Sequence, residues 1–426
     1  MNFAYDIIKT SKKIYDKNYE AALIKFYSMM RTRPLIDSTN LEGSSPPGVF
    51  VGRFGYPKVF VGPLIPPFHG DTSLLDTPEN WFGRSIKEIV DFRFSLVRGK
   101  FLTGIKDFDN RIVGITREIA LADESPDVEV EFEKKPYSKM VFDDNVQPFG
   151  PSAPLGSIFT DNIKYEKRIE KAYGDTDLKA NNAVLSLYDK GVLVSKIQKA
   201  FSVGAFGIEK NRRFVPTRWS ITAVDDIISK DLVENTRDNP MINEYRIYEI
   251  NSLDNRWIIL MMPREWCYEL IEAWYPDTLW NPDGREIVIF SDFEFYKGRK
   301  TYADIGGCYY AARLAVNELL NKEKRQAGVV ILRETHSGYL MPVGVWNVRE
   351  SVRASLKTKP KTFSTLNEAL NYISTKMDIP LRKWVETSVV IKDSIQQKKL
   401  LDFAIKNIAV QTNPFPLLDS SARNSI

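Results

Sequence analysis

The sequence predicts an α+β (mixed α/β) globular protein in two parts, with a helical segment before the first part and a helical region at the end of the second. Short β-branched and aromatic runs bounded by Gly and Pro predict strands and β-hairpins in both parts. Longer stretches with apolar residues at three- and four-residue spacing predict helices between and after them. The length of 426 residues suits two or three compact units.

Four segments are expected along the chain. The N-terminal helical segment covers residues 1–44, and apolar positions recur at helical spacing over its residues 3–32. The first domain covers 45–235, and the Asn- and Asp-rich stretch VENTRDNPMINEY marks its boundary with a second domain at 236–410. The tail, 411–426, contains Pro and Ser, and we expect it to be flexible.

The tetrapeptide VFVG occurs twice near the start of the first domain, ten residues apart. Each copy predicts a short strand, and the Phe-Gly-Tyr-Pro between them predicts the turn of a hairpin. This hairpin places Arg53 and Lys58 near one end, beside glycines that allow close backbone approach. We expect a phosphate-binding site there. A purely structural hairpin is the alternative, because the pattern matches no established nucleotide-binding loop.

The rest of the first domain alternates helices and strands. Residues 81–99 predict a helix, and the alternation of Val and Phe with Glu over 128–133 predicts a half-exposed strand. The segment DNVQPFGPSAPLGS, 144–157, predicts a loop with defined turns. Residues 161–200 are expected to be largely helical.

The stretch KNRRFVPTRW, which follows these helices, combines basic and aromatic side chains. Lysine and arginine neutralise phosphates, and aromatic rings stack on unpaired bases. This stretch is therefore the candidate DNA-binding segment. The residues expected to contact DNA are Lys210, Arg212, Arg213, Arg218 and Trp219.

The second domain is predicted to begin with strands and to end with helices. Strands are expected at 245–251, 256–262 and 286–295, and a hairpin at 328–347 with its turn at HSGY. Helices are expected at 304–325, 348–357, 364–376 and 392–408. The dense aromatic residues between the second and third strands either pack between the domains or stack on bases.

Two clusters of charged residues in the second domain are candidate sites. Asp292 and Glu294 share one face of a predicted strand and could hold a divalent ion, although an exposed strand edge is the favoured explanation. Arg349 and Arg353 lie one turn apart at the start of a predicted helix, where anions are favoured, so they are a candidate phosphate clamp. Glu350 could instead pair with either arginine in a structural ion pair.

Composition narrows the class of protein. No apolar run approaches the roughly 20 residues of a membrane span, and the N-terminus lacks a secretory pattern, so we expect a cytoplasmic protein without a membrane partner. The two cysteines and two histidines predict no structural zinc, no metal is assigned, and other cofactors are unknown. The net charge of +4 is too small to require a polyanionic partner.

Five ordered blocks resemble the signature blocks of the archaeal Nre family of DNA repair proteins. They are SPPGVFVGRFGYPKVFVGPLIPP, QPFGPSAPLG, FVPTRWSITAVDD, EAWYPDTLWNP, and the stretch from YYAARLAVNELL to VGVWNVRESVR, which together run from residue 45 to about 353. The resemblance implies a role in DNA-damage repair in an archaeal cytoplasm. It also favours a site at the VFVG hairpin.

For family members with the matching motif, the resemblance implies binding to the sliding clamp PCNA through a short C-terminal peptide. Gln397, Leu400 and Phe403 fit the clamp-peptide pattern, but Ala404 stands where a second aromatic residue is usual. These residues could instead be the packed face of a helix. The cysteine-rich zinc module common near the start of such proteins has no counterpart before Cys267.

Two functions therefore remain open from the sequence. The first is a DNA-damage repair factor that binds DNA and docks on the sliding clamp. The alternative is an enzyme that acts on DNA or on a nucleotide-derived group through a Gly- and Arg-lined anion pocket. The candidate catalytic residues are Arg53, Asp292, Glu294, Arg349, Glu350 and Arg353.

Overall fold

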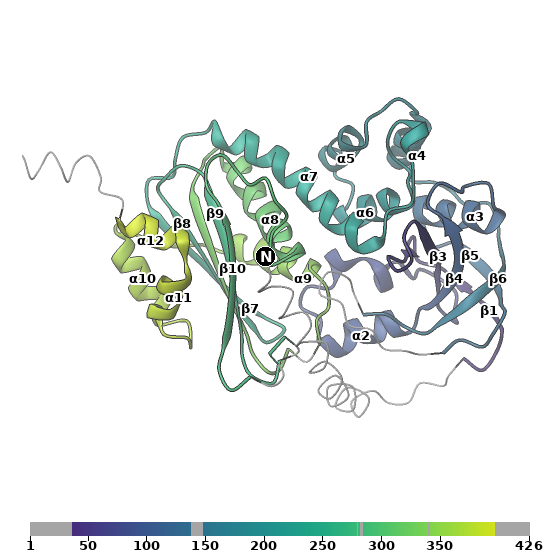
Figure 1. Ribbon diagram of the computed structural model, residues 1–426, viewed down its shortest axis with the longest axis horizontal. Coiled ribbons are helices and arrows are strands. Elements are labelled where there is room, and N and C mark those ends of the chain that lie inside the picture. Colours follow the sequence, from purple (N-terminus) through teal and green to yellow (C-terminus); the bar gives the residue numbers. More distant parts are fainter. Residues whose placement is uncertain (1–35, 138–147, 279, 282–283, 340, 397–426) are drawn as a thin grey trace, which may run out of the picture.

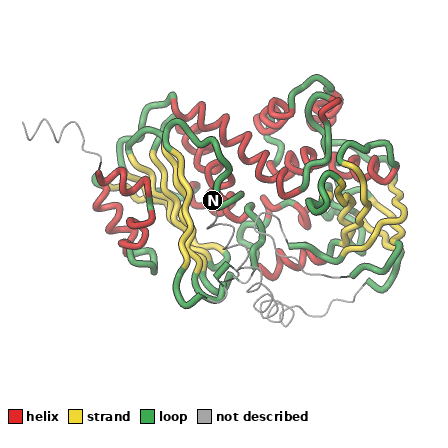
Figure 2. Tube along the Cα trace, viewed as in Figure 1, coloured by secondary structure: helices red, strands yellow, loops and turns green. Residues whose placement is uncertain are grey.

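Two mixed β-sheets of six strands each form the framework of the protein, which we describe from a computed structural model. The model describes residues 36–137, 148–278, 280–281, 284–339 and 341–396. Figure 1 shows the two sheets at opposite ends of the molecule, with the long helix α7 (Thr217–Arg237) running between the two parts. Figure 2 shows the strands of each sheet flanked by helices, which confirms the α+β class.

The first sheet has the order β1-β5-β6-β4-β3-β2. Its strands are β1 (Asn40–Ser44), β2 (Val49–Val51), β3 (Lys58–Ile65), β4 (Val97–Gly104), β5 (Asp127–Phe132) and β6 (Ser152–Thr160). The VFVG hairpin is confirmed, because β2 and β3 pair antiparallel with Val51 opposite Val61. The alternation in β5 is confirmed as well, with its Val and Phe side chains buried and its acidic residues exposed.

Three expectations for the first part need correction. Residues 40–44, the end of the predicted helical segment, form β1, which pairs with β5. The predicted helix 81–99 is shorter, because Val97 already begins β4. The predicted loop 144–157 includes the start of β6, because Ala153 and Leu155 are buried and β6 pairs with β4 and β5 despite its Pro and Gly.

Helices cover the first sheet and lead toward the second. They are the 3₁₀ turns η1 (Ser73–Asp76), η2 (Pro78–Asn80) and η3 (Glu209–Asn211), and the α-helices α2 (Ile86–Phe94), α3 (Arg111–Leu121), α4 (Lys167–Gly174), α5 (Ala180–Asp189) and α6 (Val194–Ser202). The helices expected within 161–200 are confirmed. Helix α2 begins with a capping box in which Ser85 and Glu88 satisfy each other's backbone N–H groups.

The second sheet has the order β10-β9-β11-β8-β7-β12. Its strands are β7 (Tyr245–Ser252), β8 (Asn255–Met262), β9 (Cys267–Trp274), β10 (Val288–Glu294), β11 (Gly328–Thr335) and β12 (Lys361–Phe363). The predicted hairpin at 328–347 is wrong: β11 is a single strand that lies between β9, to which it is parallel, and β8, to which it is antiparallel. The turn at HSGY therefore leads out of the sheet.

Helices cover both faces of the second sheet, as Figure 1 shows. They are α8 (Gly307–Glu323), α9 (Trp346–Leu356), α10 (Leu366–Ser374), α11 (Leu381–Thr387) and α12 (Val389–Gln396). Ile259 packs into the core under α8 and α9, whereas Leu260 packs into the core under α10 to α12. Neighbouring strand residues thus enter two different cores, and the inner strands β8, β9 and β11 are buried along nearly their whole length.

None of the helices in the described part of the chain has the length and apolar character needed to cross a bilayer. The expected helix at 392–408 is described only as far as Gln396, within α12. The limits expected for the four segments of the chain stay predictions.

Candidate nucleic-acid interface and adjoining pocket

The turn of the VFVG hairpin and the start of α7 lie side by side. The ring of Tyr56 in the turn contacts the ring of Trp219 in the first turn of α7, with 5.2 Å between centroids. The N–H of Val51 donates to Thr217 Oγ1 at 3.0 Å. The fold therefore brings together the predicted phosphate-binding turn and part of the predicted DNA-binding segment, which are about 160 residues apart in the sequence.

Backbone hydrogen bonds through the end of β4 fix this arrangement. The N–H of Ile105 donates to the Pro57 carbonyl at 3.1 Å, and the N–H of Phe214 donates to the Ile105 carbonyl at 2.8 Å. Phe214 itself is fully buried. The hairpin turn and the segment before α7 are thus attached to one rigid core.

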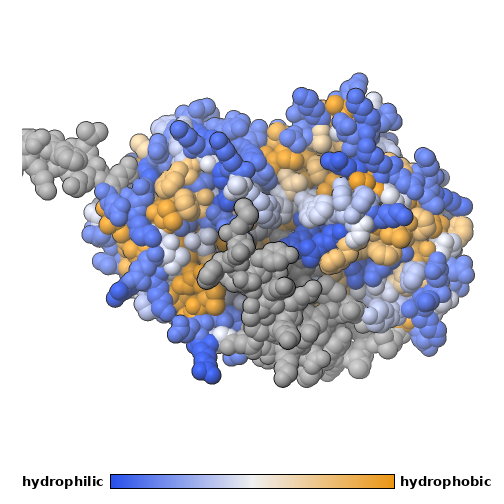
Figure 3. Space-filling view, in the orientation of Figure 1, coloured by the Kyte–Doolittle hydropathy of each residue, from blue (hydrophilic) through white to orange (hydrophobic). Residues whose placement is uncertain are grey.

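The contact between Tyr56 and Trp219 lies in an exposed surface that we call the aromatic-basic patch. It consists of Arg53, Phe54, Tyr56, Lys58 and Trp219. Its rings remain accessible: Phe54 is 74%, Tyr56 42% and Trp219 46% exposed. Figure 3 shows hydrophobic side chains interspersed with hydrophilic ones over the part of the molecule that holds the first sheet. Exposed rings beside cations can stack on bases and neutralise phosphates.

The remaining basic residues of the DNA-binding segment have different environments. Arg212 is 9% exposed and donates hydrogen bonds at 2.8 Å to the carbonyls of Gly207, Tyr173 and Asp175. A direct contact of Arg212 with DNA would require these bonds to break. Lys210 and Arg213 are exposed. Arg218 lies beside Trp219 and lines a pocket.

This pocket has a volume of about 620 Å³ and lies between the start of α7 and the second sheet. The parallel strands β9 and β11 contribute residues near their carboxyl ends, where ligands commonly bind in sheets of this kind. The start of α8, strand β10 and the loop before α9 complete the walls. The lining residues used below are Arg218, Glu272, Trp274, Trp280, Phe290, Tyr302, Asp304, Gly306, Cys308, Arg333 and Tyr339.

A buried ion pair lies at the inner end of the pocket. Arg333 donates to Glu272 at 2.6 Å and to Asn255 at 2.8 Å, and the side chains of Arg333 and Glu272 are 3% and 6% exposed. Burial by itself would lower the pKa of Arg333, but the attraction of Glu272 outweighs burial and raises it. Arg333 is therefore a permanent cation. Its guanidinium also lies 5.0 Å from the ring centroid of Trp274.

Five aromatic residues also line the pocket. Trp274 lies 6.2 Å from Tyr339 and 6.3 Å from Trp280, measured between ring centroids. Phe290 and Tyr302, which are 46% and 58% exposed, add rings that solvent reaches. The Tyr339 hydroxyl accepts a hydrogen bond from the N–H of Val343, which fixes its ring within the loop before α9.

The start of α8 opens toward the same pocket. Gly306 precedes the helix with a φ of 71°, and none of the described side chains caps the helix. Backbone N–H groups at a helix start carry partial positive charge. Asp304 and Glu272 are acidic, whereas Arg218 and Arg333 are basic, so the charges of the lining side chains balance.

Comparison with known proteins agrees with this arrangement of sequence blocks. The family model described as "Archaeal Nre, N-terminal" matches residues 16–281, and the one described as "Archaeal Nre, C-terminal" matches residues 294–403. The chain belongs to the archaeal Nre family. The resemblance expected from the five blocks is thereby confirmed.

Curated Nre relatives match over most of their length. The chain is 41% identical to DNA repair protein NreB of Archaeoglobus fulgidus, with 88% of this chain and 95% of the relative covered. It is 36% identical to DNA repair protein NreA of the same organism, covering 80% and 86%. It is 33% identical to DNA repair protein NreA of Haloferax volcanii, covering 82% and 86%. No solved structure matches the chain.

In this Nre chain the candidate phosphate clamp of α9 is part of a buried ion network. Arg349 is 1% exposed and donates to Asp225 at 2.9 Å and to Glu350 at 3.2 Å. Arg353 donates to Glu350 and to Glu318 of α8, each at 2.8 Å. The carboxylates balance both guanidinium charges inside the protein, which favours the structural alternative for this cluster.

The ion network also shifts the pKa values of two buried carboxyl groups. Burial raises the pKa of Asp225 to about 6, although Arg349 opposes the shift. For Glu79 in η2, burial alone would raise the pKa, but Arg349 and hydrogen bonds from Ser195 outweigh it and lower the pKa. Glu79 is therefore ionised at neutral pH.

Asp292 and Glu294 are each paired with an arginine. Asp292 bonds to Arg299 and accepts from the N–H of Asp304 at 2.6 Å. Glu294 is 2% exposed, accepts from Trp266 Nε1 at 3.1 Å and bonds to Arg313 at 2.7 Å. The pairs account for both carboxylates without a metal.

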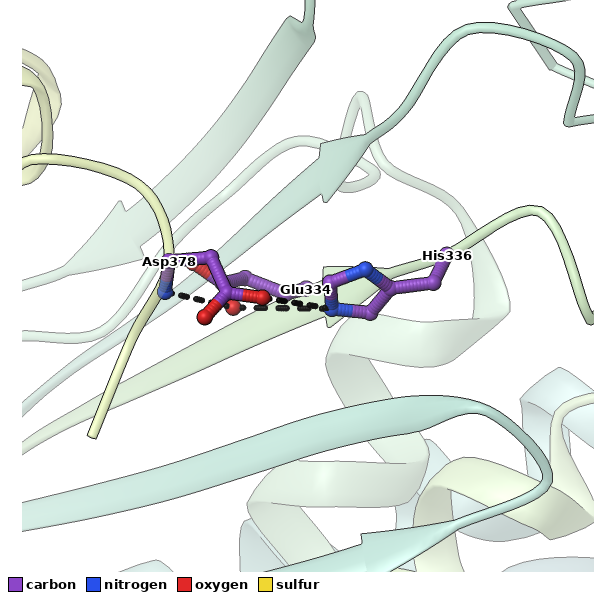
Figure 4. Close-up of side chains that lie close together, drawn as sticks. All are labelled: Glu334, His336 and Asp378. Carbon is purple, nitrogen blue, oxygen red and sulfur yellow. Dashed lines mark hydrogen bonds and ion pairs between the residues drawn. The ribbon is translucent and has the colours of Figure 1, made fainter.

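One group of possible metal ligands escaped the sequence reading. Among the described residues, Glu334, His336 and Asp378 place their ligand atoms within 4.8 Å of one another. Figure 4 shows the three side chains close together. Arg256 already donates to Asp378 at 2.6 Å, and the N–H of Ile379 donates to Glu334 at 2.8 Å. These bonds explain the carboxylates as an anchor that holds the loop between α10 and α11 against the ends of β8 and β11. Glu334 and His336 are two residues apart, but Asp378 lies 44 residues after Glu334, so local spacing could not reveal the complete cluster.

The clamp-peptide residues Gln397, Leu400 and Phe403 lie outside the described residues. The sequence also gave no signal for Tyr56 as a functional residue or for the pair of Glu272 and Arg333. The aromatic density around Trp274 and Trp280 was the one local sign of the pocket.

Proposed function

We propose that this protein is a cytoplasmic DNA-damage repair factor that binds DNA with unpaired bases through the aromatic-basic patch. Its relatives are named DNA repair proteins. The observation that carries the proposal is the contact between Tyr56 and Trp219, which joins two basic, aromatic segments into one exposed surface. Unpaired bases stack on such rings, while Arg53 and Lys58 attract the adjoining phosphates.

The charge of the patch favours this mode over tight binding to duplex DNA. Arg53 and Lys58 are its two basic residues, so the patch neutralises few phosphates at once. Stacking needs bases that are free of their partners, which a single strand or a fork supplies. We therefore expect single-stranded and forked DNA to bind more tightly than an intact duplex.

Fluorescence anisotropy with labelled single-stranded, duplex and forked DNA, repeated over a salt series, tests the proposal. The double variant Tyr56→Ala/Trp219→Ala should lose about fivefold to a hundredfold in affinity for single strands, which corresponds to the ~1–3 kcal/mol of one stacked base. Phe159→Ala is the matched control, because Phe159 is 49% exposed on β6, outside the patch. Equal losses in the double variant and the control, or no loss in either, would overturn the patch as the interface.

A denaturing gel of the DNA after incubation tests the enzyme alternative. The pocket favours this alternative, because it combines a buried ion pair with room for a small group. Intact DNA across all substrates and divalent ions supports the binding factor. Shortened or modified strands would establish an enzyme.

We also propose docking on the sliding clamp PCNA through the residues that follow α12. The support is the family resemblance together with the fit of Gln397, Leu400 and Phe403 to the clamp-peptide pattern. Calorimetry with purified PCNA should show binding by the full chain and none by Gln397→Ala/Phe403→Ala. Gln396→Ala is the neighbouring control, and equal binding by all three proteins would exclude this peptide.

A further inference from the structure

We propose that the pocket beside the aromatic-basic patch receives a single unstacked nucleobase of the bound DNA strand. The inference rests on the proposed function and names the group that this second site takes. It depends on the size and walls of the pocket, on its buried polar groups, and on its connection to the patch.

The size and walls of the pocket suit a planar heterocycle. Its volume of about 620 Å³ falls within the range of about 300–1,000 Å³ typical of pockets that enclose small ligands. Trp274, Trp280 and Tyr339 supply ring faces inside it, and Phe290 and Tyr302 supply more exposed rings. Aromatic faces bind bases without regard to sequence, because every base has a π-face.

The ion pair offers one donor and one acceptor side by side. Arg333 uses Nε and Nη1, and Glu272 uses Oε1, in the hydrogen bonds already described. Arg333 Nη2 and Glu272 Oε2 take no part in these bonds. A nucleobase edge carries adjacent donor and acceptor atoms, so it can satisfy both groups at once.

The same residues make the pocket a poor phosphate site. The carboxylates of Glu272 and Asp304 would repel a dianion, and they offset Arg218 and Arg333. The balance of charge therefore favours a neutral heterocycle.

Helix α7 connects the pocket to the patch. Arg218 lines the pocket, and Trp219, the next residue, contacts Tyr56 in the patch. A strand that crosses the patch thus passes the mouth of the pocket within a nucleotide or two. Arg218 is placed to contact the phosphate between the stacked base and the inserted one.

A bulged duplex tests the inference. One probe carries a single unpaired adenine, and the matched probe carries an abasic residue at the same position. In anisotropy measurements, wild-type protein should bind the probe with the unpaired adenine about fivefold to a hundredfold more tightly than the abasic probe. The two probes differ by the stacking of one base on aromatic rings. In the double variant Phe290→Ala/Tyr302→Ala, the ratio of the two affinities should fall toward one. Glu272→Gln should also reduce this ratio, although it keeps the shape of the pocket. Phe159→Ala should leave it unchanged.

The outcomes separate the inference from the proposed function. If the wild type binds both probes equally and the double variant Tyr56→Ala/Trp219→Ala weakens both, the patch binds DNA and the base pocket is wrong. Failure of the wild type to bind any DNA overturns both. A second measurement uses the free protein: adenosine at millimolar concentration should raise its thermal midpoint. If pyrophosphate does so and adenosine does not, the pocket takes an anion and the inference fails.

Discussion

At the scale of single residues, the environment of each arginine decides what it can do. Arg53 stands on an exposed turn, with its guanidinium 4.9 Å from the ring centroid of Phe54. Arg349 is held among Asp225, Glu350 and Glu79 with 1% of its surface exposed. Both were candidates for one anion pocket, but only Arg53 presents its charge on the surface.

Replacing the two arginines should therefore have different effects on stability. Arg349→Ala leaves buried carboxylates without a partner and should lower the free energy of unfolding by about 3–5 kcal/mol. Arg53→Ala should change it by less than about 1 kcal/mol, as is usual for a surface residue. Urea denaturation followed by circular dichroism measures both. A small effect of Arg349→Ala would show that the network is dispensable and would reopen its role as a clamp.

The sequence identifies site residues that stand out among their neighbours in the chain, but not those whose contacts depend on the tertiary fold. Trp219, Arg53 and Lys58 stand out because basic and aromatic residues alternate locally. The partner of Arg349 is Asp225, 124 residues away, so its neutralisation could not be foreseen from its neighbours. Tyr56 was read only as a turn residue, because its contact with Trp219 depends on the tertiary fold.

At the scale of elements, the close packing of two strands requires a glycine at the end of the second VFVG copy. A Cβ added at Gly62 on β3 would lie 2.0 Å from the carbonyl oxygen of Gly99 on the neighbouring β4. That oxygen belongs to the backbone, so the whole strand pair would have to shift. At Gly52, in the first copy, the nearest atom would be 3.3 Å away, on the flexible side chain of Phe50.

Gly62→Ala should accordingly destabilise the protein by about 1–3 kcal/mol, the usual cost of overpacking. Gly114→Ala is the matched control, because Gly114 lies in α3 and an added Cβ would meet nothing within 4 Å. Alanine is favoured over glycine in a helix by about 0.5–1 kcal/mol, so Gly114→Ala should be neutral or stabilising. Thermal unfolding of the two variants compares them. Equal midpoints would refute the packing argument.

The sequence predicts best those elements that have one buried face and one solvent-exposed face. Strand β5 alternates buried and exposed residues, and its pattern alone identified it. Strand β9 is buried along its whole length, so its sequence shows no alternation and indicates only an aromatic-rich stretch. Strand β11 was detected, but its partners β8 and β9 lie far back in the sequence, and a local turn was mistaken for a hairpin.

At the scale of the whole molecule, the buried ion network joins the two parts. Glu79 and Asp225 come from η2 and α7, whereas Arg349 and Arg353 come from α9 beneath the second sheet. Helix α7 packs along α8 over the same region. The patch and the pocket thus lie on a junction that buried charges hold in one geometry.

The network should give stability a characteristic dependence on pH. Burial raises the pKa of Asp225 from 3.8 to about 6, so the folded state holds this proton more tightly than the unfolded state. The resulting contribution is full below pH 4 and is lost as the pH rises toward 6. The stability of the wild type relative to Asp225→Asn should therefore fall over this interval. Urea denaturation at several pH values measures the difference, and a constant or rising difference would contradict the shift.

The position of β11 has a consequence for how the chain is made. Strands β8 and β9 leave the ribosome first, yet β11 separates them in the finished sheet. Until residues 328–335 emerge, both strands expose an edge of unpaired backbone N–H and C=O groups that can pair with other chains. The second part can therefore complete its sheet only late in synthesis. An interrupted nascent chain would be prone to aggregation and to degradation by quality-control proteases.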